Sequence, residues 1–139
     1  MNAAQSRYSG GCLCGALRWE ATGAPRYMGL CYCADCRKAS GSGFIPFIGF
    51  GADQLRIDGP TRTFTSRAAS GGPSTRNFCP TCHSMVFGGI VGETDEHTIY
   101  AGSLDDPALF APTMAIFTRD RPDWAPLPSG IAAFATMPG

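Results

Sequence analysis

The chain has 139 residues, of which 44% are hydrophobic and 16% are charged, and its formal net charge is zero. This length suits one domain with a buried core, so we predict a single domain over residues 1–139. The charge balance argues against nucleic-acid or membrane-surface partners, because both usually require a basic excess.

The first residues, MNAAQSRYSGG, show no basic region followed by an apolar one. We therefore expect no secretory signal and a cytoplasmic location. The longest apolar stretch, FIPFIGF at 44–50, is interrupted by a proline and is far too short to span a bilayer. A soluble protein is expected.

Short β-prone runs separated by glycine, proline, aspartate or serine recur along the chain. In the first, ALRWEA, Leu17 and Trp19 fall on one face of a strand, while Arg18 and Glu20 fall on the other. Similar runs are TRTFTS, STRNFC, SMVFGGIV, HTIYAGSL and TMAIFTR. Together they predict a mainly β fold.

Three stretches depart from this β pattern. A short helical turn is predicted at Asp35–Ser40, within ADCRKAS, and Gly41 ends it. SRAASGGPS at 66–74 predicts a flexible loop. From Pro126 onward we expect a loosely packed tail.

Seven cysteines fall into three short groups, Cys-x-Cys, Cys-x-Cys-x-x-Cys and Cys-x-x-Cys. The groups are Cys12 and Cys14, then Cys31, Cys33 and Cys36, then Cys79 and Cys82. An odd number of thiols cannot all pair as disulfides, and a disulfide across one strand residue would be strained. Thiolates are preferred zinc ligands, so we predict that these cysteines bind metal.

The spacing alone leaves the sharing of ligands open. Cys33 and Cys36 together with Cys79 and Cys82 would make a zinc-ribbon site and leave three thiols over. Joining the N-terminal pair to Cys79 and Cys82 instead keeps the triplet CYCADC intact. Three ligands within six residues face one ion at little loop-closure cost and leave a fourth position open, as in catalytic zinc sites. One structural zinc beside three ordinary cysteines is the remaining interpretation.

The run CPTCH also fits Cys-x-x-Cys-His, a pattern of haem attachment. That attachment normally requires export, and no signal for it is visible. We therefore interpret His83 as a bystander and not as a ligand.

Cations near the triplet are candidates for substrate binding. Zn²⁺ with three thiolates carries a net charge of −1, so a nearby cation would offset it and hold a substrate carboxylate. Arg37 and Lys38 follow the third cysteine, and Arg76 lies on the strand leading to Cys79. The plainer interpretation of Arg37 and Lys38 is solvated charge. Among the aromatic residues, Phe44 is nearest in sequence and is a candidate for the pocket wall.

The order of Cys-x-Cys, CYCADCRKASGSGF, RNFCPTCHS and GSLDDP resembles the glutathione-dependent formaldehyde-activating enzyme family, also called the GFA or CENP-V domain family. The match covers roughly residues 10–124, and the combination of pieces in this order is specific. The resemblance implies an Mss4-like fold of small antiparallel sheets with zinc knuckles. It also implies a carbon–sulfur lyase, similar to S-hydroxymethylglutathione synthase, acting on glutathione and formaldehyde.

The same resemblance implies two zinc ions and settles the sharing of their ligands. The structural zinc would take Cys12, Cys14, Cys79 and Cys82, and the catalytic-type zinc would take Cys31, Cys33 and Cys36. The open fourth position of the second zinc would accept the substrate thiol as a thiolate, which then attacks the aldehyde carbon.

Two positions depart from the family pattern. His83 follows Cys82 where relatives commonly have glycine, and Ala115 stands where a histidine is common. If that histidine binds substrate or moves a proton in the family, this chain lacks it. The alternative functions are a non-catalytic zinc-binding module and a thiol- or metal-responsive binding protein. The stretch GSLDDP fits either a substrate loop or a simple turn.

Overall fold

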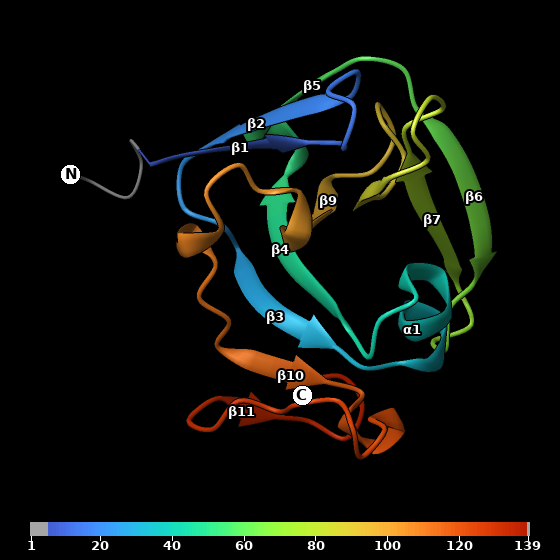
Figure 1. Ribbon diagram of the computed structural model, residues 1–139, viewed down its shortest axis with the longest axis vertical. Coiled ribbons are helices and arrows are strands. Elements are labelled where there is room, and N and C mark those ends of the chain that lie inside the picture. Colours follow the sequence, from blue (N-terminus) through green and yellow to red (C-terminus); the bar gives the residue numbers. More distant parts are fainter. Residues whose placement is uncertain (1–5, 139) are drawn as a thin grey trace.

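The computed structural model describes residues 6–138, which form two β-sheets (Figure 1). A three-stranded sheet has the order β1-β2-β5, and an eight-stranded sheet has the order β11-β10-β3-β4-β9-β8-β7-β6. Residues 1–5 and 139 lie outside the described residues, so part of the stretch that argued against a secretory signal is not included. The single-domain prediction for residues 1–139 stays a prediction.

The strands are β1 (Arg7–Gly11), β2 (Arg18–Thr22), β3 (Tyr27–Cys31), β4 (Ile45–Gly51), β5 (Leu55–Asp58), β6 (Arg62–Arg67), β7 (Pro73–Phe78), β8 (Met85–Gly88), β9 (Glu96–Tyr100), β10 (Met114–Ile116) and β11 (Ala132–Ala133). The helical segments are α1 (Ala34–Ser40), η2 (Ala52–Gln54), η3 (Ala101–Ser103), η4 (Pro107–Leu109) and η5 (Thr118–Asp120).

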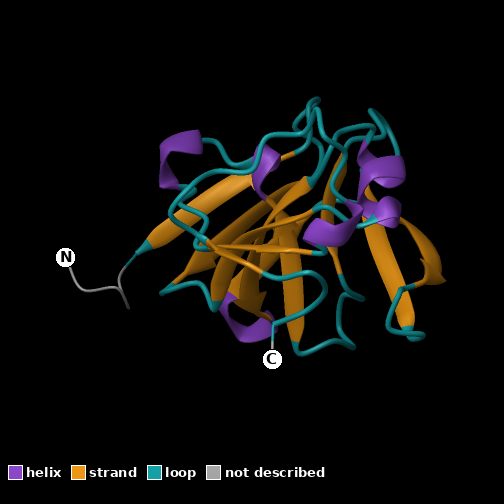
Figure 2. Cartoon of the chain, turned by 90° about the horizontal axis from the view of Figure 1, so that it is seen from below, coloured by secondary structure: helices purple, strands orange, loops and turns teal. Residues whose placement is uncertain are grey.

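The mainly β prediction is confirmed, and the helical segments are short beside the strands that fill the molecule (Figure 2). The strands pair antiparallel, except that β10 runs parallel to both β3 and β11. Among the described residues, no helix has the length and apolar character needed to cross a membrane.

The main core lies between the two sheets. Leu17 and Trp19 are fully buried there, as the alternation in ALRWEA predicts. From β4, Ile48 and Phe50 pack against them, with the Trp19 and Phe50 ring centroids 6.3 Å apart. One face of the eight-stranded sheet is thus covered by the smaller sheet.

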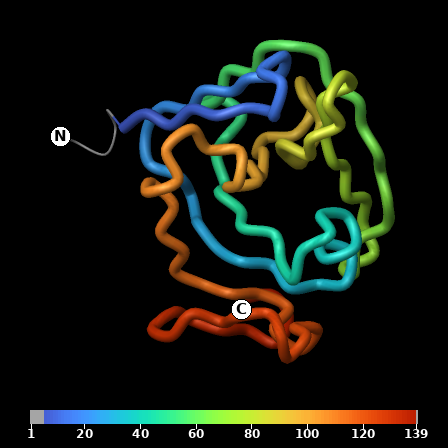
Figure 3. The backbone as a smooth tube through the Cα atoms, in the orientation of Figure 1, coloured from blue at the N-terminus to red at the C-terminus, as the bar shows by residue number. Residues whose placement is uncertain are grey.

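The opposite face of the eight-stranded sheet is turned toward α1. The sheet curls, so that the backbone passes around a curve from β3 and β4 to β7 and β6 (Figure 3). Nearly all residues of β4 are buried, because Ile48 and Phe50 pack in the main core and the Tyr27 ring covers Gly49 on the opposite face.

Two expectations about irregular segments are wrong. The stretch 66–74 is a β-hairpin, in which β6 pairs with β7 as far as Arg67 and Pro73, so only the residues between them form the turn. The C-terminal segment is not a loose tail, because Ala132 and Ala133 add an edge strand beside β10. Neither run alternates strongly enough to reveal this pairing.

The predicted helical turn is confirmed as α1. Cys33 is its N-cap residue, and the Cys33 sulfur accepts a hydrogen bond from the backbone N–H of Cys36. Gly41 ends the helix in the left-handed region, at a φ of 73°, where a glycine is favoured. The helix therefore begins inside the cysteine triplet.

Candidate functional site

Four cysteines from two distant turns meet beside the smaller sheet. Cys12 and Cys14 lie in the turn between β1 and β2, while Cys79 and Cys82 lie in the turn between β7 and β8. Their four sulfurs all lie within 4.8 Å of one another, and Cys14 is 3.6 Å from both Cys12 and Cys79. We call these residues the four-cysteine cluster.

These spacings fit a metal site. A tetrahedral zinc with Zn–S distances of about 2.3 Å places its sulfurs about 3.8 Å apart, whereas a disulfide needs about 2.05 Å. The cluster can therefore hold zinc, and its sulfurs are too far apart for disulfides. Because Cys79 and Cys82 belong to this set, neither the zinc-ribbon alternative nor the haem pattern describes the arrangement.

Ser84 ties the two turns together. Its hydroxyl accepts a hydrogen bond from the backbone N–H of Leu13 at 3.1 Å and lies 3.1 Å from the Cys82 sulfur. The hydrogen bond from Ser84 lowers the pKa of Cys82 to about 5 and so favours the thiolate that a metal needs. The sequence analysis missed this serine.

The second group, Cys31, Cys33 and Cys36, is continuous in sequence, and we call it the three-cysteine cluster. Its sulfurs also lie within 4.8 Å of one another. Cys31 ends β3, Cys33 caps α1, and Cys36 stands in the first turn of that helix. The strand end and the helical turn bring all three sulfurs to one point, so this cluster can also hold zinc.

Hydrogen bonds within the three-cysteine cluster separate the pKa values of its thiols. Cys33 accepts hydrogen bonds from Cys31 and Cys36, which lower its pKa to about 2. The same interaction with Cys33 raises the pKa of Cys31 to about 12, and the pKa of Cys36 is raised by Cys31 and Cys33. Zinc ligands must be deprotonated, so binding of zinc by all three sulfurs would release protons.

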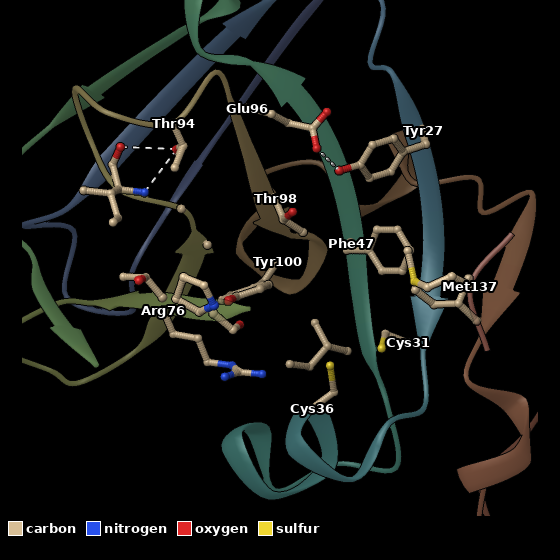
Figure 4. A pocket seen from close by; sticks show the side chains of 18 of the residues that line it. Tyr27, Cys31, Cys36, Phe47, Arg76, Thr94, Glu96, Thr98, Tyr100 and Met137 are labelled. Carbon is tan, nitrogen blue, oxygen red and sulfur yellow. Dashed lines mark hydrogen bonds between the residues drawn. The ribbon is translucent and has the colours of Figure 1, made fainter. Parts of the chain in front are cut away.

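A cavity of about 720 Å³ opens beside the three-cysteine cluster and is lined by Cys31 and Cys36 (Figure 4). Its wall is the free face of the eight-stranded sheet, together with Met137 and Pro138 of the C-terminal segment. None of the residues of the four-cysteine cluster, all of which are described, borders it. The three-cysteine cluster therefore faces a space that can admit a small molecule.

Arg76 is the buried cation of this cavity. It reaches from β7 toward α1 and Cys36 (Figure 4), and only 7% of it is exposed. Its Nε has no hydrogen-bond partner within residues 6–138, nor does the side chain form an ion pair there. A buried guanidinium with free donors suits an anionic ligand group.

The other two predicted cations are placed differently. Arg37 is partly buried and Lys38 is exposed on α1, and neither is among the described residues that line the cavity. Their role in substrate binding stays a prediction, without a cavity contact in its support. Phe44, the expected wall residue, packs instead against Tyr32 in a separate cluster, and Phe47 takes the place in the wall.

The end of the cavity away from the cysteines is closed by Tyr27. Its ring lies over Gly49 of β4, and a Cβ atom added at Gly49 would come within 2.2 Å of the ring. The Tyr27 hydroxyl donates a hydrogen bond to Glu96 on β9, and burial raises its pKa to about 12. Tyr27 and Glu96 were missed by the sequence analysis, and the glycine in FIPFIGF is the only local signal of this contact.

The two departures from the family pattern lie outside the cavity wall. His83 is exposed and has a φ of 63°, a region in which glycine is unstrained. Ala115 is fully buried against Leu30 and Tyr32, and it is Met114 and Ile116, its neighbours on β10, that line the cavity. A side chain at 115 points away from the cavity, because side chains alternate along a strand.

The stretch GSLDDP acts as a structural turn. The carboxylate of Asp105 accepts hydrogen bonds from Arg18 at 2.9 Å and from Ser9 at 2.8 Å, and Leu104 is buried in the main core. These contacts fasten the turn to the smaller sheet. The stretch borders no part of the cavity.

Comparison with known proteins agrees with this arrangement. The family model described as glutathione-dependent formaldehyde-activating enzyme, GFA, matches residues 7–120. The chain belongs to the GFA family. The matched range contains both cysteine clusters and Arg76, but it ends before the C-terminal segment that lines the cavity.

A solved structure supports the fold of this GFA chain. A crystal structure of a Rhodobacter sphaeroides protein matches with a TM-score of 0.53 and 19% sequence identity, covering 91% of this chain and 98% of that one. At this identity the likeness concerns the fold alone. No curated protein gives a significant match to the chain.

Proposed function

We propose that this GFA protein is a zinc-dependent carbon–sulfur lyase that joins or releases a small aldehyde and a thiol such as glutathione. The observation that carries the proposal is the opening of the three-cysteine cluster, through Cys31 and Cys36, onto a cavity that also holds a buried, unpaired arginine. The family membership supports the same substrates.

The two clusters take different roles in this proposal. The four-cysteine cluster supplies a complete ligand set for a structural zinc and stabilises the fold. Cys31, Cys33 and Cys36 would hold the second zinc with three protein ligands. When bound there, zinc would supply an electrophilic centre that favours the thiolate form of the substrate at neutral pH.

The reaction itself is an addition to a carbonyl group. The thiol loses its proton, its sulfur forms a bond to the aldehyde carbon, and the carbonyl oxygen takes up a proton to give R–S–CH(OH)–R′. The reverse reaction breaks the same carbon–sulfur bond and returns thiol and aldehyde. Atoms and electrons balance without an oxidant or a reductant.

The residues of the cavity orient this reaction. The Arg76 guanidinium binds a carboxylate of the thiol substrate and offsets the negative charge of three thiolates. Burial raises the pKa of Tyr100, so its hydroxyl keeps its proton and can donate a hydrogen bond to the carbonyl oxygen. The apolar side chains around Cys31 limit access of water.

Exchange spectroscopy by NMR tests the proposal. With zinc-loaded protein, we expect faster exchange between free aldehyde, glutathione and their hemithioacetal than in buffer. Cys36→Ser should reduce this acceleration at least about 100-fold, because it removes a proposed metal ligand. If the exchange rate with protein equals that in buffer, the lyase proposal is wrong and a non-catalytic zinc-binding module is favoured. Ala39→Ser, at an exposed position of α1, is the matched control.

A further inference from the structure

The wall of the cavity divides into two chemically different halves. The apolar half comes from β10, β3 and β4, which are neighbours in the sheet. The polar half comes from β9, β8 and β7 on the other side. The apolar half contains Ile45, Phe47, Met114 and Ile116, and the other half carries the polar side chains of Ser74, Arg76, Glu96, Thr98 and Tyr100 together with the apolar Pro73 and Ile90.

The apolar half is continuous across β3. Gly29 has no side chain, and a Cβ there would meet the Phe47 ring at 2.6 Å and the Met114 side chain at 3.0 Å. These two residues therefore close over the strand from its two sides. Ile116 and Phe47 also pack in one cluster with Cys31, so the apolar surface reaches the thiol itself.

This surface bears on the choice of aldehyde. The polar half, with Arg76, suits the carboxylate of a thiol such as glutathione. Formaldehyde carries only hydrogen atoms on its carbonyl carbon and would leave the apolar half facing water. An aldehyde with an apolar substituent would cover it and gain affinity in proportion to the area removed from water.

We infer that the natural aldehyde carries an apolar substituent of several carbons, which lies on the wall formed by Phe47, Met114 and Ile116 beside Cys31. This inference rests on the proposed function and extends it from formaldehyde to larger apolar aldehydes. The hemithioacetal then spans the cavity, with its substituent on β10, β3 and β4 and its carboxylate at Arg76.

Calorimetric binding of S-alkylglutathiones to the zinc-loaded protein tests the inference, because these stable thioethers imitate the adduct without reacting. Each methylene that leaves water is worth about 0.8 kcal/mol, or about fourfold in Kd. We therefore expect S-pentylglutathione to bind at least about tenfold more tightly than S-methylglutathione. Equal Kd values for the two compounds would overturn the inference.

Two variants test where the alkyl chain of the ligand binds. Met114→Gln keeps the length of the side chain but makes the apolar half polar, so we expect the preference for the pentyl compound to fall severalfold. Met28→Gln makes the same change on β3, one residue before Gly29, the pairing partner of Met114. The Met28 side chain packs toward the main core and not into the cavity, so the preference should persist. A preference unchanged in Met114→Gln would place the alkyl chain elsewhere and contradict the inference.

Measuring the NMR exchange rate with different aldehydes distinguishes a failure of this inference from a failure of the proposed function. We expect the NMR exchange rate to be accelerated more for pentanal than for formaldehyde. Acceleration for both aldehydes without preference, together with equal Kd values, would overturn the apolar subsite and leave the lyase function standing. A pentyl preference without acceleration for any aldehyde would support the subsite and overturn the lyase. If no S-alkylglutathione binds and no exchange is accelerated, both fail.

Discussion

The two cysteine clusters use the same ligand atom in different surroundings. The four-cysteine cluster joins turns that are 65 residues apart between Cys14 and Cys79, and none of its residues lines the cavity. The three-cysteine cluster is local, joins no distant segments, and opens onto the cavity through Cys31 and Cys36. In the proposed function, the number of ligands and the space beside them, and not the thiol chemistry alone, separate the structural site from the reactive one.

The largest effect is expected from breaking the four-cysteine cluster. Cys79→Ser should destabilise the protein by more than about 3 kcal/mol, because the binding energy of a structural zinc is part of the folding energy. Denaturant unfolding and zinc content per chain measure the change. Cys36→Ser is the matched control and should leave stability much closer to the wild type. Similar losses in both variants would contradict the division of roles.

The next largest effect is expected on substrate binding in the cavity beside the three-cysteine cluster. Arg76→Met removes the buried cation, and we expect KM for glutathione to rise about 10- to 100-fold, the equivalent of a lost charged hydrogen bond. Steady-state kinetics with varied glutathione provide the measurement. Arg62→Met, on the exposed strand β6, is the control and should leave KM unchanged. An unchanged KM in Arg76→Met would remove Arg76 from the substrate site.

A smaller effect on stability is expected from replacing His83, beside the four-cysteine cluster. His83 occupies a left-handed conformation directly after Cys82. His83→Gly should relieve that strain and stabilise the protein by about 1 kcal/mol, whereas His83→Ala keeps a Cβ and should give no such gain. Thermal unfolding of the zinc-loaded variants distinguishes them. A loss of zinc in both variants would instead make His83 part of the metal site.

The smallest effect concerns the salt bridge that fastens the turn after η3 to the smaller sheet. The hydrogen bond from Arg18 lowers the pKa of Asp105 to about 2 from an ordinary value of 3.8. Since the folded pKa is depressed, the stabilisation is complete above about pH 4 and is lost as the pH falls toward 2. Asp105→Asn should therefore cost less than about 1 kcal/mol at pH 7, because the pair is largely exposed.

The pH dependence of that variant provides the check. The difference in unfolding free energy between wild type and Asp105→Asn should shrink as the pH is lowered from 5 to 2. A difference that grows on acidification would mean that the carboxylate is not the stabilising form.

Local features of the fold were predictable from the sequence. The alternation around Trp19, the cysteine spacing, and the helical turn ended by Gly41 each depend on neighbours within a few residues. Such patterns fix which face of a strand is buried and where a short helix ends. They also sufficed to nominate Arg76 from its position on the strand leading to Cys79.

The cavity was not predictable in the same way. Tyr27 and Glu96 are 69 residues apart, and they meet only because β3, β4 and β9 lie side by side in one register. The edge strand β11 and the parallel pairing of β10 likewise depend on long-range contacts. Sequence-local reasoning therefore selected Phe44 for the wall, although the strand order places Phe47 there.

The central claim is that the three-cysteine cluster is the open metal site that carries the chemistry. Its most direct test is treatment of the zinc-loaded protein with a mild chelator, following zinc per chain, exchange activity and circular dichroism together. The account predicts that one zinc leaves readily, that activity falls in proportion to it, and that the fold persists until the second zinc is lost. Activity that survives the loss of the first zinc, or unfolding that accompanies it, would contradict the account.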